Sequence, residues 1–366
     1  MLKKVLILSG IEWNTTIQRH HVISNWFLDY NYDVTFIEGI MSSSFSFEKF
    51  LKKIKKLLFC RKNKFSQKID NTKNGIKVIN AKLINPQGGV FRLYNSFQIQ
   101  KLLKNIDKDY DIVVVYIPVR TTYEIINNLD YKYLLYDCVR DFKNWGGYPK
   151  DLPLIEKNIM DNSYKILVDS FYLKKKLYNL GYGNKIIQIL PHLTVNELNL
   201  YKNNKAKYSI QRLFYFGDVG DHIDVNLMKK LSEQGIEIHI AGIINTSLDF
   251  KFIYHGYFSK KEDLAEVICN NADAILIPYK GNMDGVIPAK IMQSLATNLP
   301  VYISSFYDSE YLNKYLIVYK TYNDLLNLID SYNLIDFNLT LNSRKEFVEK
   351  NVVDVQKDVF MYELFK

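Results

Sequence analysis

The chain has 366 residues, of which 48% are hydrophobic, and a formal net charge of +9. This length predicts two domains of ordinary size, and the apolar content excludes a disordered chain. The three cysteines lie too far apart in the sequence for a disulfide framework or a cysteine zinc site, and no apolar run reaches the roughly 18 residues of a membrane-spanning helix. We therefore expect a cytoplasmic protein, with the inner face of the cell membrane as an alternative location.

The N-terminal half alternates strand-like and helix-like segments, which predicts βαβ units around a parallel sheet. The expected strands are 4–9, 33–38, 76–79, 111–117, 133–136, 165–169 and 185–190. The expected helices are 16–31, 97–106 and 172–180. Gly181 is expected to end the last of these helices.

The second half repeats this alternation after a polar stretch, 192–211, which we interpret as a linker. Its expected strands are 213–216, 237–241, 252–256, 274–278 and 300–304, and its expected helices 225–234, 260–270, 289–296 and 321–330. We expect an N-terminal domain at 1–191, a C-terminal domain at 212–340, and a C-terminal helix at 341–366 that packs back on the first domain. Both domains are expected to be α/β and doubly wound, with a ligand cleft between them at the carboxyl ends of their strands.

The stretch 273–304 carries the most chemical information. A strand, a polar loop with Gly285, and a helix that begins near Pro288 follow one another. A helix N-terminus suits a phosphate, because its N–H groups are free and it carries a partial positive charge. Lys290 in the first turn adds a charge for a diphosphate, and Gln293 on the same face can reach a ribose hydroxyl.

This stretch resembles the nucleotide-sugar site of GT-B glycosyltransferases. The likeness is strongest to enzymes of bacterial cell-surface polysaccharide synthesis, of the teichuronic-acid and xanthan glucuronosyltransferase types. Their Pro-x-Lys-x-x-Glu/Gln-x-Leu-Ala-x-Gly-x-Pro-Val pattern is matched by Pro288, Lys290, Gln293, Leu295, Ala296, Pro300 and Val301. Asn298 replaces the usual glycine, and asparagine also adopts the left-handed conformation that ends a helix. Gln293 replaces the glutamate that grips the ribose in the retaining family-4 enzymes.

The resemblance implies two Rossmann-like domains facing a central cleft, with the donor bound by the second. In the segment 213–228, Gly217 would let the diphosphate approach the backbone, while Asp224 is expected to cap a helix. In the segment 252–264, Tyr257 would lie near the base. The implied donor-binding residues are Gly217, Asp218, Tyr257, Asp284, Gly285, Val286, Ile287, Pro288, Lys290 and Gln293.

Polar residues also follow the first expected strand. Trp13, Gln18 and Arg19 match the family's Trp…Gln-Arg segment. Arg19 would face a phosphate of the donor or the acceptor, and a surface ion pair is the alternative. His20 would serve as a base or a ligand, but no third ligand has suitable spacing, so we expect no metal.

The segment 133–142 places Asp137, Arg140 and Asp141 at the end of a strand, where related enzymes show Tyr-Asp-x-x-Asp-Asp. A carboxylate at this position is a candidate general base for a sugar hydroxyl, so Asp137 or Asp141 is the expected catalytic residue, with Arg140 facing a phosphate or the acceptor. The alternative is that Asp137 caps a turn and Asp141 pairs with Arg140. The Asp-x-Asp pattern in 107–111 precedes its strand, which is the wrong end for a site.

The segment 47–65 combines eight basic residues with apolar residues at helical spacing. It is typical of a helix on an anionic membrane surface, or of an ordinary helix with a solvated basic face. Nucleic acid is not an expected partner, because no known binding module accompanies the charge.

These features predict a glycosyltransferase that moves a sugar from a nucleoside diphosphate sugar, with UDP favoured, to a hydroxyl of a cell-surface glycan precursor. The expected acceptor is lipid-linked, and no cofactor or metal is expected. A sugar-nucleotide epimerase and a catalytically silent scaffold subunit of a transferase complex are the alternatives. Gln293 and Arg140, which stand in place of common acids, favour the scaffold.

Overall fold

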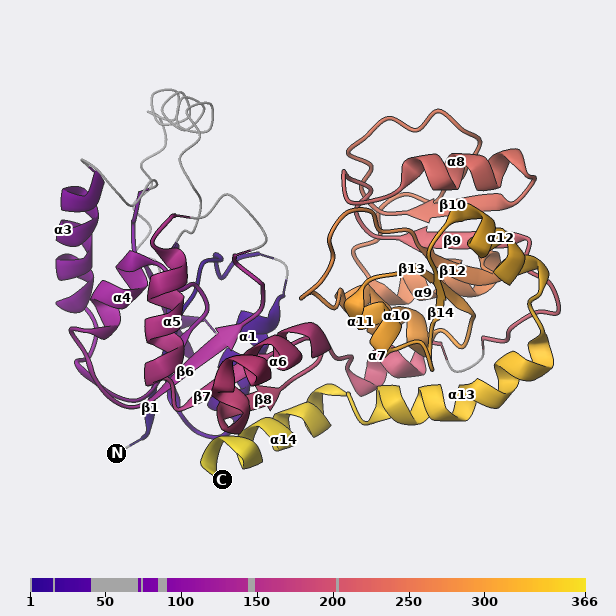
Figure 1. Ribbon diagram of the computed structural model, residues 1–366. Coiled ribbons are helices and arrows are strands. Elements are labelled where there is room, and N and C mark those ends of the chain that lie inside the picture. The colour runs from indigo at the N-terminus through magenta and orange to yellow at the C-terminus, as the bar shows by residue number, and fades with distance from the viewer. Residues whose placement is uncertain are drawn as a thin grey trace. The chain divides into compact units, whose positions relative to one another are not determined.

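The computed structural model describes residues 2–15, 17–40, 72–73, 75–84, 91–143, 149–201 and 204–366. The basic segment 47–65 lies outside them. Contacts divide the chain into two units, Met1–Val168 with Leu177–Ile187 and Asp169–Lys176 with Gln188–Lys366. Each unit is a sheet of mainly parallel strands connected by helices (Figure 1).

Across the described residues, the sheet of the first unit has the strand order β3-β4-β2-β1-β5-β6-β7-β8. Its strands are β1 (Lys4–Leu8), β2 (Asp33–Glu38), β3 (Thr72–Lys73), β4 (Ile76–Asn80), β5 (Asp109–Val115), β6 (Asp130–Cys138), β7 (Lys165–Val168) and β8 (Ile186–Gln188). The central strand β1 pairs in parallel with β2 and β5. Its residues from Val5 to Leu8 are completely buried, as expected for a strand covered on both faces.

The helices of this unit are α1 (Arg19–Asp29), α3 (Phe91–Leu103), α4 (Arg120–Ile126) and α5 (Leu152–Asn162). Helix α6 (Phe171–Leu177) begins in the second unit and ends in the first. Its start is held by Asp308 of the second unit, whose Oδ1 accepts hydrogen bonds from the backbone N–H of Phe171 (2.7 Å) and Tyr172 (3.3 Å). A π-helical turn, Tyr178–Tyr182, follows α6, and Gly181 within it leaves the helical conformation with φ +91°.

The sheet of the second unit has the order β11-β10-β9-β12-β13-β14 and is parallel throughout. Its strands are β9 (Arg212–Phe216), β10 (Glu237–Ala241), β11 (Ile253–Tyr254), β12 (Ala274–Ile277), β13 (Val301–Ser304) and β14 (Ile317–Tyr319). Its helices are α7 (Val195–Asn199), α8 (Val225–Glu233), α9 (Lys261–Asn271), α10 (Ala289–Ala296), α11 (Tyr307–Tyr311), α12 (Tyr322–Asp330), α13 (Leu334–Glu349) and α14 (Val353–Phe365).

Both sheets reverse their strand order once. In the first unit the chain adds β2 and β4 on one side of β1 and then β5 on the other; in the second it adds β10 and β11 beside β9 and then β12 on the opposite side. Such a reversal opens a crevice at the carboxyl ends of the two strands that flank it. The fold therefore supplies one candidate ligand site in each unit.

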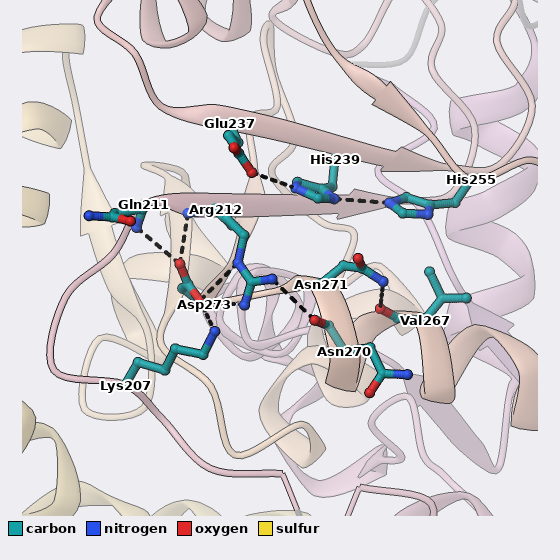
Figure 2. A network of polar contacts seen from close by, with 10 residues as sticks. All are labelled: Lys207, Gln211, Arg212, Glu237, His239, His255, Val267, Asn270, Asn271 and Asp273. Carbon is teal, nitrogen blue, oxygen red and sulfur yellow. Dashed lines mark hydrogen bonds and ion pairs between the residues drawn. The ribbon is translucent and has the colours of Figure 1, made fainter.

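The opposite, amino edge of the second sheet is held by an ionic network around the buried Asp273 (Figure 2). Its carboxylate accepts from the Arg212 guanidinium (2.9 Å), the Lys207 ammonium (2.8 Å) and the backbone N–H groups of Gln211 and Arg212. Burial raises the pKa of Asp273, but these hydrogen bonds outweigh it and leave the pKa below its ordinary value. The network joins the start of β9 to the residue before β12, so its role is structural.

The elements α4, α5, α11 and β14 were not expected from the sequence, and two further segments differ from the expectation. The stretch 192–211 contains α7, whose N-cap Thr194 forms a reciprocal capping box with Glu197. The C-terminal helical tail starts earlier than expected and consists of two helices, α13 and α14. They are separated where Val352 pairs with Leu193 in a β-bridge, since Val353 donates its backbone N–H to the Leu193 carbonyl (2.9 Å).

Candidate functional site

Two glycines bring the loops after β9 and β10 into contact. Gly217 follows β9 with φ +115° and donates its N–H to the Ala241 carbonyl (2.8 Å). Gly242 follows β10 with φ +138°, and a Cβ atom there would overlap the Gly217 carbonyl oxygen. A Cβ atom on Gly217 would lie 2.8 Å from the Nζ of Lys290. The backbone at the crevice is therefore open only because these residues lack side chains.

Lys290 lies in the first turn of α10, and its ammonium group points at this loop. Its Nζ donates to the Tyr215 hydroxyl (2.8 Å) and lies 4.2 Å from the Tyr215 ring centroid and 5.5 Å from that of Tyr279. Burial lowers the pKa of Lys290 to about 7, against the opposing charge of Asp218. Among the described residues no carboxylate forms an ion pair with Lys290, so an anionic ligand would supply the missing counter-charge.

The N-terminus of α10 is uncapped. Pro288 occupies the N-cap position, and no side chain in the described ranges accepts a hydrogen bond from the first turn. The sequence pattern predicted a helix from residue 289 to 296, and α10 spans these residues. Its first N–H groups and the Lys290 ammonium together form an anion-binding arrangement.

The preceding loop is held in place by its own polar residues. Asp284 accepts from the backbone N–H of Tyr307 (2.9 Å), and its own N–H donates to Asn282 (2.9 Å). Gly285 has φ +86°, and Ile287 is buried in the core. Of these predicted donor residues, Asp284 and Ile287 position the loop, and the half-buried Val286 lies between them.

The other predicted donor residues follow β9 or β11, or lie in α10. Asp218 is exposed and accepts from the Asn245 amide (2.6 Å). Tyr257 is 67% exposed, and Gln293 is half-buried one turn beyond Lys290. Asp224 caps α8 by accepting from the Leu227 N–H (3.0 Å), which confirms the expected helix cap.

Sequence reasoning did not identify three residues around Lys290. Tyr215 and Tyr279 form its aromatic surroundings, and burial together with the Lys290 charge lowers the pKa of His222. Tyr215 also donates its hydroxyl to the Asp218 carbonyl (2.6 Å). The sequence did offer one sign of them, because Tyr215 and Tyr279 each lie near the carboxyl end of a strand, β9 and β12.

The crevice of the first unit holds a second polar cluster. Ser9 follows β1, Tyr116 follows β5 and Asp137 lies near the end of β6, so three neighbouring strands contribute. Asp137 is fully buried, and both of its carboxylate oxygens accept from the Arg19 Nε (3.0 and 2.8 Å). Burial, together with the charge of Asp137, raises the pKa of the Tyr116 phenol well above its ordinary value.

His20 completes this cluster. Its ring stacks on Tyr116 at 3.7 Å, and its Nδ1 shares a hydrogen bond with the Ser9 hydroxyl (2.9 Å). Burial lowers the pKa of His20 to about 3, and the adjacent histidine, Arg19 and Arg140 act in the same direction. The imidazole is therefore neutral at physiological pH and acts as a hydrogen-bonding group.

The remaining predicted residues of this unit lie around the cluster. Trp13 is half-buried, packs edge-on against Phe36 (4.9 Å between ring centroids) and donates its backbone N–H to Glu38 (2.8 Å). Arg140 is exposed, and Asp141 is 2% exposed just after β6. The structure thus brings Arg19, His20 and Asp137 together.

Within the described ranges, no group of three or more histidine, cysteine, aspartate or glutamate side chains could hold a metal ion. For the same part of the chain, no helix is both long and apolar enough to cross a membrane.

The sequence matches no protein-family model and no curated protein. Solved structures do match over nearly the whole chain. HepE from Anabaena, in complex with UDP and glucose, is 10% identical with a TM-score of 0.64, and the match covers 99% of both chains. Sucrose-phosphate synthase from Thermosynechococcus elongatus is 11% identical (TM-score 0.62; 99% of this chain and 98% of that one). A glycosyltransferase from Rickettsia africae is 13% identical (TM-score 0.62; 100% and 99%).

These likenesses define the class of fold. The chain has the GT-B fold of two Rossmann-like α/β domains, as the sequence predicted. At such low identity the fold is what the neighbours share with this chain.

Proposed function

We propose that this protein is a glycosyltransferase that takes a sugar from a nucleoside diphosphate sugar, with UDP favoured, and attaches it to a hydroxyl group. One observation carries this proposal: the half-buried Lys290 lies in the first turn of α10, beside Gly217, and its ammonium has no carboxylate partner among the described residues. A diphosphate supplies the negative charge that this arrangement lacks. The similar HepE structures contain UDP or UDP-glucose, which supports the same donor class here.

Breaking the bond between the sugar and the diphosphate leaves negative charge on the leaving diphosphate. The Lys290 ammonium and the N–H groups of α10 would stabilise that charge without rearrangement. Gly217, Asp218, Gln293 and Tyr257 would contact the rest of the donor. Because Lys290 and the N–H groups of α10 would stabilise the leaving diphosphate themselves, we propose a reaction that proceeds without a metal ion.

We assign the acceptor side to the polar cluster of the first unit. Asp137 or Asp141 would accept the proton of the attacking hydroxyl, with Arg19 positioning Asp137 through their ion pair. Trp13, His20 and Arg140 would face the acceptor or a phosphate. As finer proposals, supported by the resemblance of the sequence, the acceptor is a lipid-linked precursor of a cell-surface glycan and segment 47–65 binds an anionic membrane.

Replacing the base should reduce turnover by about 10²- to 10⁴-fold. We expect this loss in either Asp137→Asn or Asp141→Asn, with donor affinity changed less than threefold. Asp107→Asn is the matched control, because Asp107 pairs with Lys4 before the start of β5 and should leave turnover unchanged. Steady-state kinetics separate the two effects, and normal turnover in both test variants would remove both carboxylates from the mechanism.

Donor affinity should depend on pH through Lys290. The ligand binds the ammonium form, and the pKa of Lys290 in the free protein is about 7. The affinity for the donor is therefore highest below pH 7 and falls by up to about tenfold per pH unit above it. Above pH 7, binding takes up a proton. Calorimetry with UDP at pH 6.5, 7.5 and 8.5, in buffers of different ionisation enthalpy, measures both quantities. Lys290→Arg, which stays charged, should flatten the profile, and a flat wild-type profile would contradict this role.

The transfer itself is tested by release of nucleoside diphosphate from labelled nucleotide sugars, with and without lipid-linked glycan acceptors. The proposal expects release that rises when an acceptor is added, with the label joined to the acceptor. An epimerase would convert the sugar without an acceptor. A scaffold subunit would bind the nucleotide and release nothing. Either of the last two results would overturn the proposed activity.

A further inference from the structure

The second unit contains a pocket of about 290 Å³ away from the residues assigned to the donor. It is lined by residues that begin β13 and β14, including Val301 and Ile317, together with residues of α13. Because the strands are parallel, this is the amino edge of the sheet, whereas the Lys290 loop follows the carboxyl ends. Leu316, Leu328 and Phe337 give the pocket an apolar wall.

The pocket contains a buried guanidinium group. Arg344 of α13 is 1% exposed, and its Nη2 donates to the carbonyls of Leu299 (2.8 Å) and Leu295 (3.4 Å). Its Nε and Nη1 have no hydrogen-bond partner among the described residues, and no carboxylate there forms an ion pair with it. The Phe337 ring lies 5.0 Å from the guanidinium carbon. Among the described residues, only one of the three guanidinium nitrogens therefore has a hydrogen-bond partner.

A second unsatisfied group lines the same pocket. The buried Tyr332 hydroxyl has no partner in the part of the chain that the structure describes. Burial raises the pKa of Tyr332 to about 12 and lowers that of Arg344 to about 9. Leaving a buried donor unsatisfied costs about 1–3 kcal/mol, and more when it is charged, so native proteins keep few such groups. Two such groups in one pocket favour a ligand with acceptor atoms there.

The charges that line the pocket favour a ligand with a single negative charge. Arg344 contributes one buried positive charge, while Lys314 and Asp336 line the pocket as exposed residues of opposite sign. A monoanion neutralises the guanidinium, whereas a phosphate dianion would leave an uncompensated buried charge. Arginine suits a planar carboxylate, and the apolar wall suits a hydrophobic body.

We propose that this pocket binds a small organic monocarboxylate, with the carboxylate on the Arg344 guanidinium and the Tyr332 hydroxyl and the apolar body against Leu316, Leu328 and Phe337. The site is separate from the one proposed for the donor. Its occupancy does not require that the protein transfer sugar.

Benzoate is the probe for the test, with inorganic phosphate as the second ligand and sodium chloride at equal ionic strength as reference. Benzoate should raise the melting temperature of the full-length protein saturably, and calorimetry should give one site per chain. Arg344→Met should abolish the shift. Tyr332→Phe should weaken binding by about five- to tenfold. Tyr319→Phe should not, because it removes a buried hydroxyl that lies outside the pocket and has no hydrogen-bond partner among the described residues.

A second pair of variants keeps the test decisive if Arg344→Met does not fold. Thr340 lines the pocket one turn before Arg344. Among the described residues, its hydroxyl donates only to the Phe337 carbonyl of its own helix (2.7 Å). Thr340→Leu fills the pocket and should abolish binding, while the isosteric Thr340→Val should preserve it. Saturable binding of phosphate in place of benzoate, or of neither, would overturn the proposal, as would undiminished binding to Thr340→Leu.

Discussion

Replacing Lys290 by alanine should weaken the binding of UDP and UDP-sugars by about a hundredfold or more. A charge-assisted contact to a desolvated phosphate contributes about 2–5 kcal/mol, and about 2.7 kcal/mol corresponds to a factor of one hundred. Lys290 is a half-buried cation that faces the loop after β9, with the rings of Tyr215 and Tyr279 around it. Calorimetric titration of both proteins with UDP at pH 6.5, where the ammonium form is populated, gives the ratio of dissociation constants.

The fold should survive this change. The Lys290 ammonium is costly to bury, so removing it should leave the free energy of unfolding unchanged or raise it in the absence of nucleotide. Lys251→Ala is the control, because Lys251 is exposed and has no ion pair among the described residues. Equal UDP affinity in wild type and Lys290→Ala would remove this residue, and the anion site built on it, from the account.

Gly242→Ala should destabilise the second unit by about 4 kcal/mol or more, which is at the extreme of single substitutions. The added methyl group would overlap the Gly217 carbonyl oxygen, and φ +138° is strained for alanine. Relief requires the loops after β9 and β10 to separate, so nucleotide binding should be lost together with stability. Urea unfolding followed by circular dichroism measures the free energy.

Gly235→Ala measures the cost of positive φ alone, without a steric overlap. Gly235 also has positive φ (+85°), but no atom lies within 4 Å of where its Cβ would be. It should cost about 1 kcal/mol, the ordinary penalty of the left-handed conformation, and leave UDP binding intact. If both variants lose the same stability, the close approach of the two loops is not what requires glycine at position 242.

The sequence predicted the regular elements best where apolar periodicity and breakers agree. The span of α10 follows from an amphipathic run bounded by Pro288 and by Asn298, which takes φ +57° as expected for a cap. Short elements were missed, because α4, α7, α11 and β14 are too brief to show a period. The 11-residue helix α5 was missed as well. The break between α13 and α14 depends on pairing with Leu193, far away in the sequence, so no local pattern marks it.

The candidate sites were predictable only where their residues belong to a local sequence pattern. Lys290 stands out because a local pattern, a strand, a loop and a helix start, carries its chemistry. Its aromatic partner Tyr215 lies 75 residues away, and the Arg19–Asp137 pair spans 118 residues. Such pairs form only when the sheet order brings strands together. Arg344 showed no signal at all, because in the sequence it is one more charged residue on a polar helix.

The most direct test of the donor site is a thermal-shift panel of UDP, GDP, dTDP, CMP and their common sugars, with and without EDTA. A ligand at 100 times its dissociation constant stabilises the protein by about 2.7 kcal/mol, which such a panel resolves. We expect UDP and a UDP-sugar to raise the melting temperature equally with and without EDTA, and the rise to disappear in Lys290→Ala. No shift with any nucleotide at millimolar concentration would contradict a nucleotide-sugar site at the N-terminus of α10.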